Sequence, residues 1–532
     1  MKTFIITLSY LLLSATILAQ KTEVYFGVPN RMDYVSDIMK IYDNGYYITG
    51  GFVDSTGLNK GWNIKTNVNL ELLYAKKYEH PNGDIAFHCS ASDTSGNIYS
   101  AGQTDYPDIW PVITKTNTCS EKQWCKILDY SYDGFDYGAG LDILINESNE
   151  IIVLVLMVDI PSAMEQIHLI ALNEEGDLLW RKPYASKYDH PLIDNAAGYH
   201  VSEIGGEYYI SGYCYYPYPN DPDHLFLRPL FIGIDSAFNE KWILPFARLD
   251  SVYGDAYNTI AINNSMLMGV GIRRAYNSNN EDNALLMFYN KNGKELGYTN
   301  IENDQLGSDV HSSVIRVIER INDTMFITGS SFGPDYAENP AGEFIIDTSG
   351  NIYNSEIREN TVSISLTKTF DTNYVFATNY KTTPTKWDIY VYKIDENLQD
   401  VPFDSLAHNY DTLCPGGIQS GTIDLTDCFL WTNVNETPSP EAYYASLKKI
   451  PVKAYPNPVT GGRISFEYQN TQHHTDILLK CFDVLGHEMH SESIYRGQSG
   501  NSVNVNNWPS GVYLAIIFSS GKPAGKCTFV VR

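Results

Sequence analysis

Tyrosines and acidic residues occur together in three parts of this 532-residue chain, at spacings short enough to form ligand-binding surfaces. Tyrosine rings stack on sugar rings or anchor protein partners, and nearby carboxylates hydrogen-bond to hydroxyl groups. These residues are therefore candidates for binding a glycan or a protein. The alternative is that the tyrosines only fill a surface and the acids only contact water. The candidates are Tyr215, Tyr216, Tyr218, Asp221, Asp223, His224, Tyr130, Tyr132, Asp133, Asp136, His80 and His190.

Catalytic motifs are almost absent from the chain. It has no HExxH zinc motif and no phosphate-binding P-loop. Residues 329–333 fit G-x-S-x-G, but they follow a strand and open no helix, so we expect no nucleophile elbow. Asp93 and Asp347 begin identical Asp-Thr-Ser-Gly-Asn runs, which predict hairpin turns. Carboxylates from different repeats could still be assembled for glycoside hydrolysis.

Metal and nucleic-acid binding are both disfavoured. Carboxylate-rich loops could bind calcium, but no EF-hand or other ordered ligand run is present, so we expect no metal and no cofactor. The chain has 63 acidic and 37 basic residues, a net charge of −26. Such a surface repels phosphates, and no basic cluster offsets it, so we expect no nucleic-acid partner.

A strand pattern recurs through the main part of the chain. An apolar strand, a small turn and a second strand repeat seven times, with a third and usually a fourth strand after them. The centres of the second strands are Tyr47, Tyr99, Val153, Tyr209, Leu267, Phe326 and Val375, 49 to 59 residues apart. Four strands at this period are typical of a propeller blade. The fold class predicted is all-β: a seven-bladed β-propeller followed by a small C-terminal Ig-like β-sandwich. The alternative is two stacked β-sandwiches.

The ring should close on an N-terminal strand. Residues 22–27 precede the first repeat and are predicted to complete the seventh blade, which removes the exposed sheet edge. Turns between first and second strands, and between third and fourth strands, are short. The longer second-to-third and blade-to-blade connections share the opposite rim, which is the predicted binding surface because rigid scaffolds place function on such loops.

Eight cysteines in an exported chain favour disulfides. Cys119 and Cys125 flank a predicted hairpin turn, and Cys414 and Cys428 bracket a loop after the repeats. Cys481 and Cys527 lie in strand-like runs near the end of the chain. Pairing within each of these three couples is the simplest expectation, although eight cysteines allow 105 connectivities.

The N-terminus has the features of a secretory signal peptide. A basic start at Lys2 precedes an apolar run from Phe4 to Leu18, and Ala19 is a plausible cleavage position. The run is short for a membrane span. The alternative is an N-terminal helix of the mature fold.

The C-terminal residues carry a second set of signals. Tyr455-Pro456-Asn457-Pro458 is followed by Gly461-Gly462, Asp483-Val484-Leu485-Gly486 and Gly511-Val512-Tyr513-Leu514. In this order and position the segment resembles the type A C-terminal sorting domain of the type IX, or Por, secretion system. The sorting-motif residues are Tyr455, Pro456, Asn457, Pro458, Gly511, Tyr513 and Leu514. The alternative is an ordinary accessory sandwich.

The resemblance implies partners and a destination. In this family the translocon recognises the domain, sortase-like machinery removes it, and the cargo is often attached to surface lipopolysaccharide. It therefore implies a secreted or cell-surface location, reached through the periplasm. The predicted parts are a signal peptide (1–19), the propeller (20–404), a linker with a Cys414/Cys428 loop (405–450) and the sorting domain (451–532).

The sequence favours a non-enzymatic binding protein for a glycan or a protein. The alternative is a propeller hydrolase or lyase acting on extracellular polysaccharide.

Overall fold

The computed structural model divides the chain into two units, Met1–Val434 and Asn435–Arg532. It describes residues 21–431 and 452–532 with short gaps, so the predicted signal peptide lies outside the described residues. The gaps are 29–30, 82, 106–107, 132–134, 160–163, 187–189, 191, 219–220, 247–252, 275–281, 308–309, 334–339, 384–385, 460, 469–476, 484–487, 495–499 and 520–521. Among the described residues, none of the helices has the length and apolar character needed to span a membrane.

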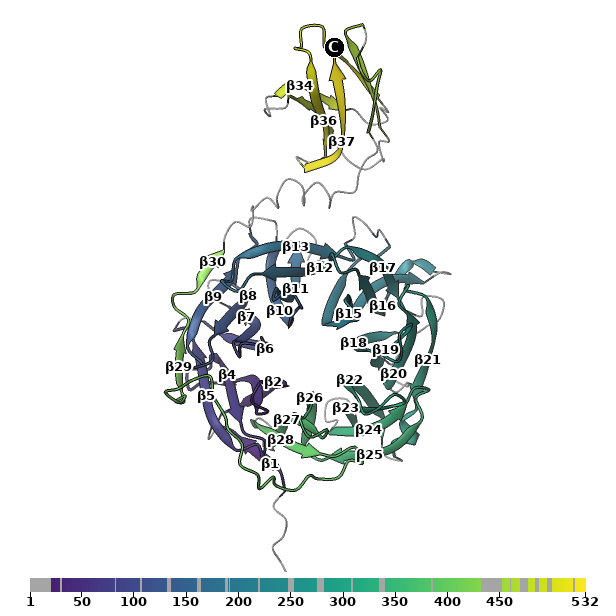
Figure 1. Ribbon diagram of the computed structural model, residues 1–532. Coiled ribbons are helices and arrows are strands. Elements are labelled where there is room, and N and C mark those ends of the chain that lie inside the picture. Colours follow the sequence, from purple (N-terminus) through teal and green to yellow (C-terminus); the bar gives the residue numbers. More distant parts are fainter. Residues whose placement is uncertain are drawn as a thin grey trace, which may run out of the picture. The chain divides into compact units, whose positions relative to one another are not determined.

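In the first unit, the described residues form seven antiparallel sheets arranged in a ring (Figure 1). Blades 1 to 3 contain β2 (Asp33–Lys40), β3 (Tyr46–Val53), β4 (Asn59–Thr66) and β5 (Leu72–Glu79); β6 (Ile85–Ser92), β7 (Ile98–Thr104), β8 (Trp110–Thr116) and β9 (Lys122–Leu128); and β10 (Phe135–Ile145), β11 (Ile151–Asp159), β12 (Met164–Leu172) and β13 (Leu178–Tyr184).

Blades 4 to 6 contain β14 (Ala196–Ile204), β15 (Glu207–Tyr218), β16 (Asp221–Ile234) and β17 (Glu240–Pro245); β18 (Gly254–Ala261), β19 (Met266–Arg273), β20 (Asn283–Asn290) and β21 (Glu295–Ile301); and β22 (Ser312–Arg320), β23 (Met325–Gly333), β24 (Ala341–Asp347) and β25 (Ile352–Arg358). A 3-10 turn, Asn303–Gln305, lies between β21 and β22. Blade 7 contains β26 (Thr361–Lys368), β27 (Tyr374–Thr383), β28 (Lys386–Ile394) and β1 (Glu23–Phe26).

Each second strand carries one of the seven repeat centres found in the sequence, from Tyr47 in β3 to Val375 in β27. The apolar cores lie between neighbouring sheets. One buried cluster joins blades 3 and 4 through Leu154, Leu169, Ile210 and Ile232. Because a single sheet cannot cover both its faces, the blades depend on one another. The β-propeller prediction is confirmed.

The ring closes as the sequence predicted. β1 pairs antiparallel with β28, with Glu23 opposite Tyr392 and Phe26 opposite Ile389. Blades 1 and 7 are also joined by side chains: the Val35 amide donates to Asn379 Oδ1 at 2.8 Å, and the Ser365 hydroxyl donates to Asp37 Oδ1 at 2.9 Å.

The seven turns between third and fourth strands share one device. In each, an Asn or Asp side-chain oxygen accepts the backbone N–H of the residue four positions later, at 2.7 to 3.0 Å. The residue three positions after the Asn or Asp always has a positive φ. These turn residues are Asn67, Asn117, Asn173, Asp235, Asn290, Asp347 and Asp395. Leu70, Phe238 and Leu398 adopt the left-handed conformation and are buried, so apolar packing offsets the backbone strain. The hairpin turns predicted at Asp93 and Asp347 are confirmed.

A C-terminal strap, residues 404–431, runs along the outside of blades 1 and 2 (Figure 1). β29 (Gly421–Asp424) pairs in parallel with β5, and β30 (Phe429–Trp431) pairs in parallel with β9. The buried Lys65 ammonium contacts both Asp43 of blade 1 and Asp411 of the strap.

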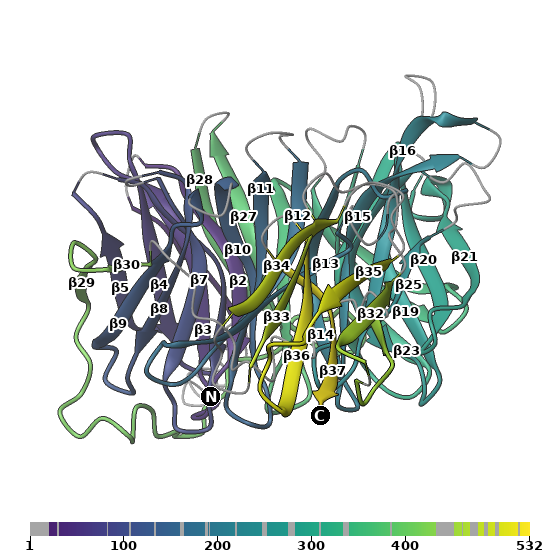
Figure 2. The same cartoon turned by 90° about the horizontal axis from the view of Figure 1, so that it is seen from above.

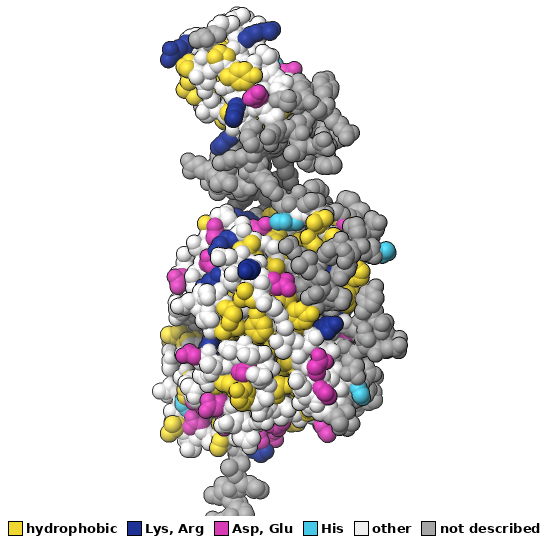
Figure 3. Space-filling model, turned by 90° about the vertical axis from the view of Figure 1, so that its right-hand side faces the viewer, with side chains coloured by type: hydrophobic (Ala, Val, Ile, Leu, Met, Phe, Trp, Pro, Cys, Tyr) yellow, Lys and Arg dark blue, Asp and Glu magenta, His cyan; other side chains and the backbone are white. Residues whose placement is uncertain are grey.

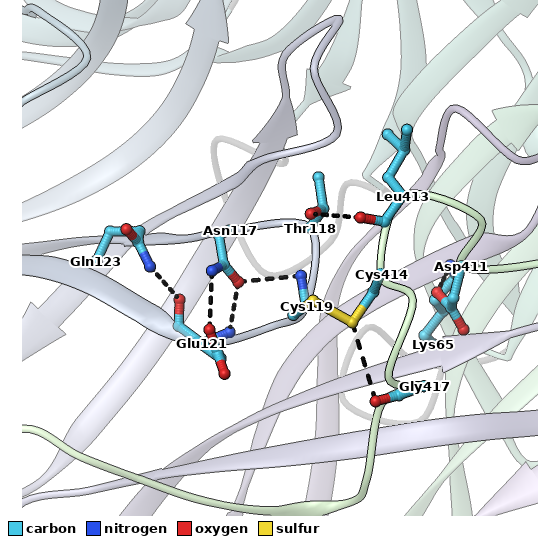
Figure 4. The surroundings of a disulfide bond; sticks show 10 residues. All are labelled: Lys65, Asn117, Thr118, Cys119, Glu121, Gln123, Asp411, Leu413, Cys414 and Gly417. Atoms are coloured by element: carbon cyan, nitrogen blue, oxygen red, sulfur yellow. Dashed lines mark hydrogen bonds and ion pairs between the residues drawn. A yellow bond between two sulfur atoms is a disulfide. The ribbon is translucent and has the colours of Figure 1, made fainter.

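Two disulfides fasten the strap, and their pairing corrects the sequence expectation. Cys119 is bonded to Cys414 (Figure 4) and Cys125 is bonded to Cys428, so each bond joins blade 2 to the strap. The sequence analysis paired cysteines that are close in sequence, because the path of the strap along blade 2 cannot be seen in the sequence. The bonds close loops of 295 and 303 residues.

The second unit contains two sheets around one core. β31 (Val452–Tyr455), β32 (Arg463–Tyr468) and β35 (Gly500–Asn504) form one, and β33 (Ile477–Phe482), β34 (Glu488–Ile494), β36 (Gly511–Ser519) and β37 (Lys522–Val531) form the other. Phe466, Leu479, Tyr513 and Phe529 belong to the shared core. The expected Cys481–Cys527 disulfide is absent from the described residues, because β36 lies between the strands that carry these cysteines and both thiols are free.

Replacing Cys119, Cys125, Cys414 and Cys428 together by Ser should lower the free energy of unfolding by roughly 5 kcal/mol or more, because a loop of about 300 residues is released. Removing one pair should cost less, since the other bond closes a nearly equal loop. Thermal unfolding of the variants measures this, and wild type treated with dithiothreitol should match the fourfold variant. Non-reducing peptide mapping that found Cys119 bonded to Cys125 would contradict the structure.

Gly293→Ala should destabilise the propeller more than Gly206→Ala. Both glycines have positive φ, 73° and 76°, so both variants carry the left-handed strain of about 1 kcal/mol. A Cβ at Gly293 would lie 2.4 Å from Trp242 Cδ2, whereas nothing lies within 4 Å of one at Gly206. Overpacking should add about 1 to 3 kcal/mol at Gly293. Equal urea midpoints for the two variants would contradict this contact.

Candidate functional site

The innermost strands line a central cavity of about 830 Å³. In each blade the pairing of the first and second strands has a β-bulge, which inserts one extra residue into the innermost strand. A bulge re-aims nearby side chains. The inserted residues are Ser36, His88, Leu141, Tyr199, Tyr257, Arg316 and Ile364. The sequence analysis missed them, although they recur at 48 to 59 residues in step with the blades.

Two carboxylates in the cavity wall join neighbouring blades. Asp37 Oδ2 accepts the Ser90 amide of blade 2 at 3.1 Å. Asp142 Oδ2 accepts the Val201 amide of blade 4 at 2.8 Å and lies 2.6 Å from His200 Nδ1. Burial raises the pKa of Asp37, while its hydrogen bonds oppose the shift. These acids are already engaged by the protein, so they serve to hold the ring together.

The bulge residues of three consecutive blades, 4 to 6, stack on one another. The rings of Tyr199 in β14 and Tyr257 in β18 are stacked, with centroids 5.1 Å apart and planes 26° apart. The Arg316 guanidinium carbon in β22 lies 5.2 Å from the Tyr257 centroid. All three side chains are partly buried and line the cavity. The part of the cavity wall formed by blades 4 to 6 therefore carries two aromatic rings and one cationic side chain.

Two more tyrosines of blade 4 lie beside Tyr199. The ring centroid of Tyr213 is 5.7 Å from that of Tyr199, and the ring centroid of Tyr215 is 6.3 Å from that of Tyr213, with an interplanar angle of 83°. Both are on β15, whose hairpin with β16 extends past its neighbours on one face of the ring (Figure 2). This is the face of the second-to-third connections.

Charged groups surround these rings. Arg274 Nε donates to Asp255 Oδ2 at 2.8 Å, and the Tyr257 hydroxyl lies 3.4 Å from the same oxygen. The Tyr213 hydroxyl donates to Glu165 of blade 3. We call the set Tyr199, Tyr213, Tyr215, Tyr257, Arg316, Arg274, Asp255 and Glu165 the Tyr–Arg cluster.

Burial shifts the acidities within the cluster. Asp255 is buried, which raises the pKa of its carboxyl, while Arg274 opposes the shift. Burial and the neighbouring Glu165 raise the pKa of Tyr213 well above its usual range, so this phenol is a neutral hydrogen-bond donor. Partly exposed rings, donors and acceptors can together stack on a sugar and hydrogen-bond to its hydroxyls. Within the described residues, no group of three or more His, Cys, Asp or Glu side chains is placed to hold a metal ion.

The candidate binding residues between 215 and 224 lie in different surroundings in the structure. Tyr215 belongs to the Tyr–Arg cluster. Tyr216 points to the opposite face of β15 and packs against the core between blades 3 and 4. His224 is exposed on β16. Tyr218, Asp221 and Asp223 lie in the same hairpin, where Tyr218 is paired with Asp221, and their side chains are outside the description.

The remaining candidates are mostly packed against the protein. Tyr130 is buried, with the Arg181 guanidinium 4.6 Å from its ring centroid. His80 is also buried. His190 Nε2 lies 2.8 Å from Glu240 Oε1 and joins blade 3 to blade 4. Tyr132 and Asp133 lie outside the described residues, and Asp136 is in β10 with its side chain undescribed. We therefore leave these residues out of the candidate site.

Residues 329–333 lie within β23 or at its end, and Ser331 is buried there. No nucleophile elbow is formed at this position, because the segment is an internal strand paired on both sides.

The outer wall of the ring was the other surface considered. Figure 3 shows hydrophobic side chains lying among charged ones on one side of the ring. Leu296 of β21 and Tyr353 and Ile357 of β25 are exposed at the perimeter. They are scattered single side chains on edge strands, so we do not assign a site there.

In the second unit, the residues of the predicted sorting motif make structural contacts. Asn457 Oδ1 accepts the Val530 amide at 3.0 Å, and its Nδ2 donates to Thr528 O at 3.1 Å, so the motif is fastened to β37. The buried Tyr513 donates to Pro509 O at 2.6 Å, and Leu514 pairs between Phe482 and Thr528. Tyr455 is half exposed, and Gly511 begins β36. Pro456 and Pro458 both follow cis peptide bonds.

Residues 453–531 match the family described as the Secretion system C-terminal sorting domain. The predicted type IX sorting domain is therefore confirmed. No curated protein sequence matches this chain.

The fold is similar to several solved structures. They include the Dos1 propeller (9% identity, 67% of this chain and 77% of that chain, TM-score 0.40) and the β-propeller domain of the Trilobed protease from Pyrococcus furiosus (10%, 71% and 99%, 0.39). A mutant sialidase of Trypanosoma rangeli displaying trans-sialidase activity is also similar (9%, 97% and 91%, 0.39). Identities this low say nothing about activity.

The fold and the C-terminal match together define an exported β-propeller protein with a type IX sorting domain. The domain directs it to the cell surface or the extracellular space.

The pKa values of His200 and His168 should be shifted in opposite directions. Burial opposes the charge of His200, but the neighbouring Asp142 carboxylate prevails and raises its pKa. Burial lowers the pKa of His168 to about 3, with Arg181 adding to the shift. Carbon-detected NMR titration should show His200 charged above pH 6.5 and His168 neutral throughout the neutral range.

The raised pKa of His200 also predicts a pH-dependent stability. The charged pair should stabilise the fold fully below pH 6.5, and this contribution should be lost as pH rises through the folded-state pKa. The melting temperatures of wild type and His200→Gln should therefore differ most at pH 6 and converge at higher pH. A difference that grows with pH would contradict the pair.

Proposed function

We propose that this protein is a non-enzymatic binding protein for glycans and that the Tyr–Arg cluster is its binding site. The observation that carries the proposal is the Tyr199–Tyr257–Arg316 stack, built from the bulge residues of three consecutive blades beside the cavity. Tyrosine faces in a cleft favour sugar rings, whose axial C–H groups pack on aromatic surfaces while their hydroxyls need hydrogen-bond partners. Asp255, Arg274 and Glu165 supply such partners at the edges of the rings.

Glycan binding by the full mature chain can be measured on a glycan array and then by calorimetry. Tyr257→Ala should weaken binding of the best glycan by about twofold to tenfold, since an aromatic stacking contact contributes about 0.5 to 1.5 kcal/mol. Tyr257→Phe keeps the stacking surface and should retain most of the affinity. The matched control is Tyr353→Ala on β25, which removes a tyrosine that is 65% exposed on the outer wall.

The outcome against this proposal is equally defined. Absence of binding to any glycan on the array, or equal loss in the Tyr257→Ala and Tyr353→Ala variants, would contradict it.

Glycoside hydrolysis is the second candidate, and one observation favours it. Glu165 contacts the Tyr213 hydroxyl, and burial raises the pKa of Asp255, a second carboxyl of the same cluster. Such a set could supply a nucleophile and an acid. We prefer binding because the Tyr213 pKa is raised, which disfavours a phenolate, and because Asp255 is held by Arg274. Reducing-sugar release from a bound polysaccharide, abolished in Asp255→Asn, would reverse this preference.

We also propose the route to the surface. Residues 1–19 are removed as a signal peptide, and residues 451–532 are removed by sortase-like machinery after passage through the translocon. The matured propeller is then retained on lipopolysaccharide or released. The match of residues 453–531 to the sorting-domain family supports this route.

A further inference from the structure

Arg316 differs from three other arginines of the ring, Arg274, Arg358 and Arg320, in its described contacts. Arg274 is paired with Asp255, and Arg358 lies near Glu343, Glu356 and Asp400. Arg320, at the end of β22, donates to the Ile262 carbonyl. Among the described residues, Arg316 has neither a carboxylate within ion-pair distance nor a hydrogen-bond partner for its buried Nε. Its described contact is the face of Tyr257.

An arginine in this position is costly unless a further group joins it. Removing a guanidinium from water without a charged or hydrogen-bonding partner is unfavourable. Arg316 acts electrostatically on the Asp255 carboxyl, but Asp255 is already paired with Arg274. Arg316 is the inserted bulge residue of β22 and lines the cavity, so a ligand in the cavity can reach its guanidinium.

We propose that Arg316 recognises an anionic group of the ligand, so that the glycan ends in a sugar carrying a carboxylate or a sulfate. This inference rests on the glycan binding proposed above and names the class of glycan. The planar guanidinium fork suits both groups, because each presents two oxygens to parallel N–H donors. The ring of the same sugar stacks beside Tyr257 and Tyr199.

The remaining charges of the cavity limit the ligand to one anionic residue. Asp37, Asp142, Glu203 and Glu319 line the same cavity, so a second anion in it would meet carboxyl groups. The whole chain also carries a net charge of −26, which repels long polyanions. The expected ligand is therefore a glycan whose one charged residue is an acidic terminal sugar.

The test uses the full mature chain on an array printed with matched pairs. Each pair holds a sialylated, uronic-acid-terminated or terminally sulfated glycan and its neutral parent. Wild type should bind one acidic class about tenfold to a hundredfold more tightly than the neutral parent, as expected for charge-assisted hydrogen bonds. The class that binds distinguishes carboxylate from sulfate.

Calorimetry on the best pair then assigns the effect to Arg316. Arg316→Gln should lower the affinity for the acidic member to that of its neutral parent, whereas Tyr257→Ala should weaken both members. The matched control is Arg320→Gln, four residues along the same strand, which should leave the ratio between acidic and neutral glycans unchanged. Circular dichroism melts confirm that each variant is folded.

Two results would overturn the inference. Equal wild-type affinity for acidic and neutral members would refute the role of Arg316 while leaving glycan binding intact. Binding of no member of any pair would refute both the inference and the proposed function.

Discussion

Closure of the ring is the constraint on which the rest of this structure depends. Each blade buries its faces only against its two neighbours, so an opening at any point would expose two apolar sheets. The pairing of β1 with β28 closes the ring through backbone hydrogen bonds. The disulfides of the C-terminal strap add a covalent closure, because they bond the segment after blade 7 to blade 2. Both closures hold the seven innermost strands at fixed positions around the cavity.

The candidate site follows from this geometry. The bulge in each innermost strand inserts one extra residue, and three neighbouring blades use that position to place Tyr199, Tyr257 and Arg316 in the cavity wall. Elsewhere in the wall, Asp37 and Asp142 accept amide hydrogens from the next blade and so contribute to the joints of the ring. Asp37 and Asp142 directly follow the inserted residues Ser36 and Leu141, so these joints lie beside the same bulges. Acidic side chains that hold a scaffold are poor candidates for acid–base chemistry, which is consistent with binding.

The sequence predicted the repeat, the closing strand and the export domain, because each depends on local patterns of apolar residues, turns and motifs. It also pointed to the segment around Tyr215, since tyrosines gather there. The sequence could not show that Tyr215 faces the cluster while Tyr216 faces the core, because the face of each side chain depends on the register of β15 between β14 and β16. Tyr130 and His80 were candidates because of their neighbours in sequence, yet tertiary packing buries both. The disulfides were mispaired because the strap passes residues 290 positions or more distant. The residues inserted at the bulges were detectable as a periodic signal and were overlooked.

Hydrogen–deuterium exchange of the propeller, with and without a bound glycan, tests the central claim most directly. If the Tyr–Arg cluster is the binding site, added protection should concentrate in β14, β15, β18 and β22, the strands that carry Tyr199, Tyr213, Tyr257 and Arg316. Exchange in the outer strands β13, β17, β21 and β25 should be unchanged. Protection confined to those outer strands, or to the strap, would contradict the account.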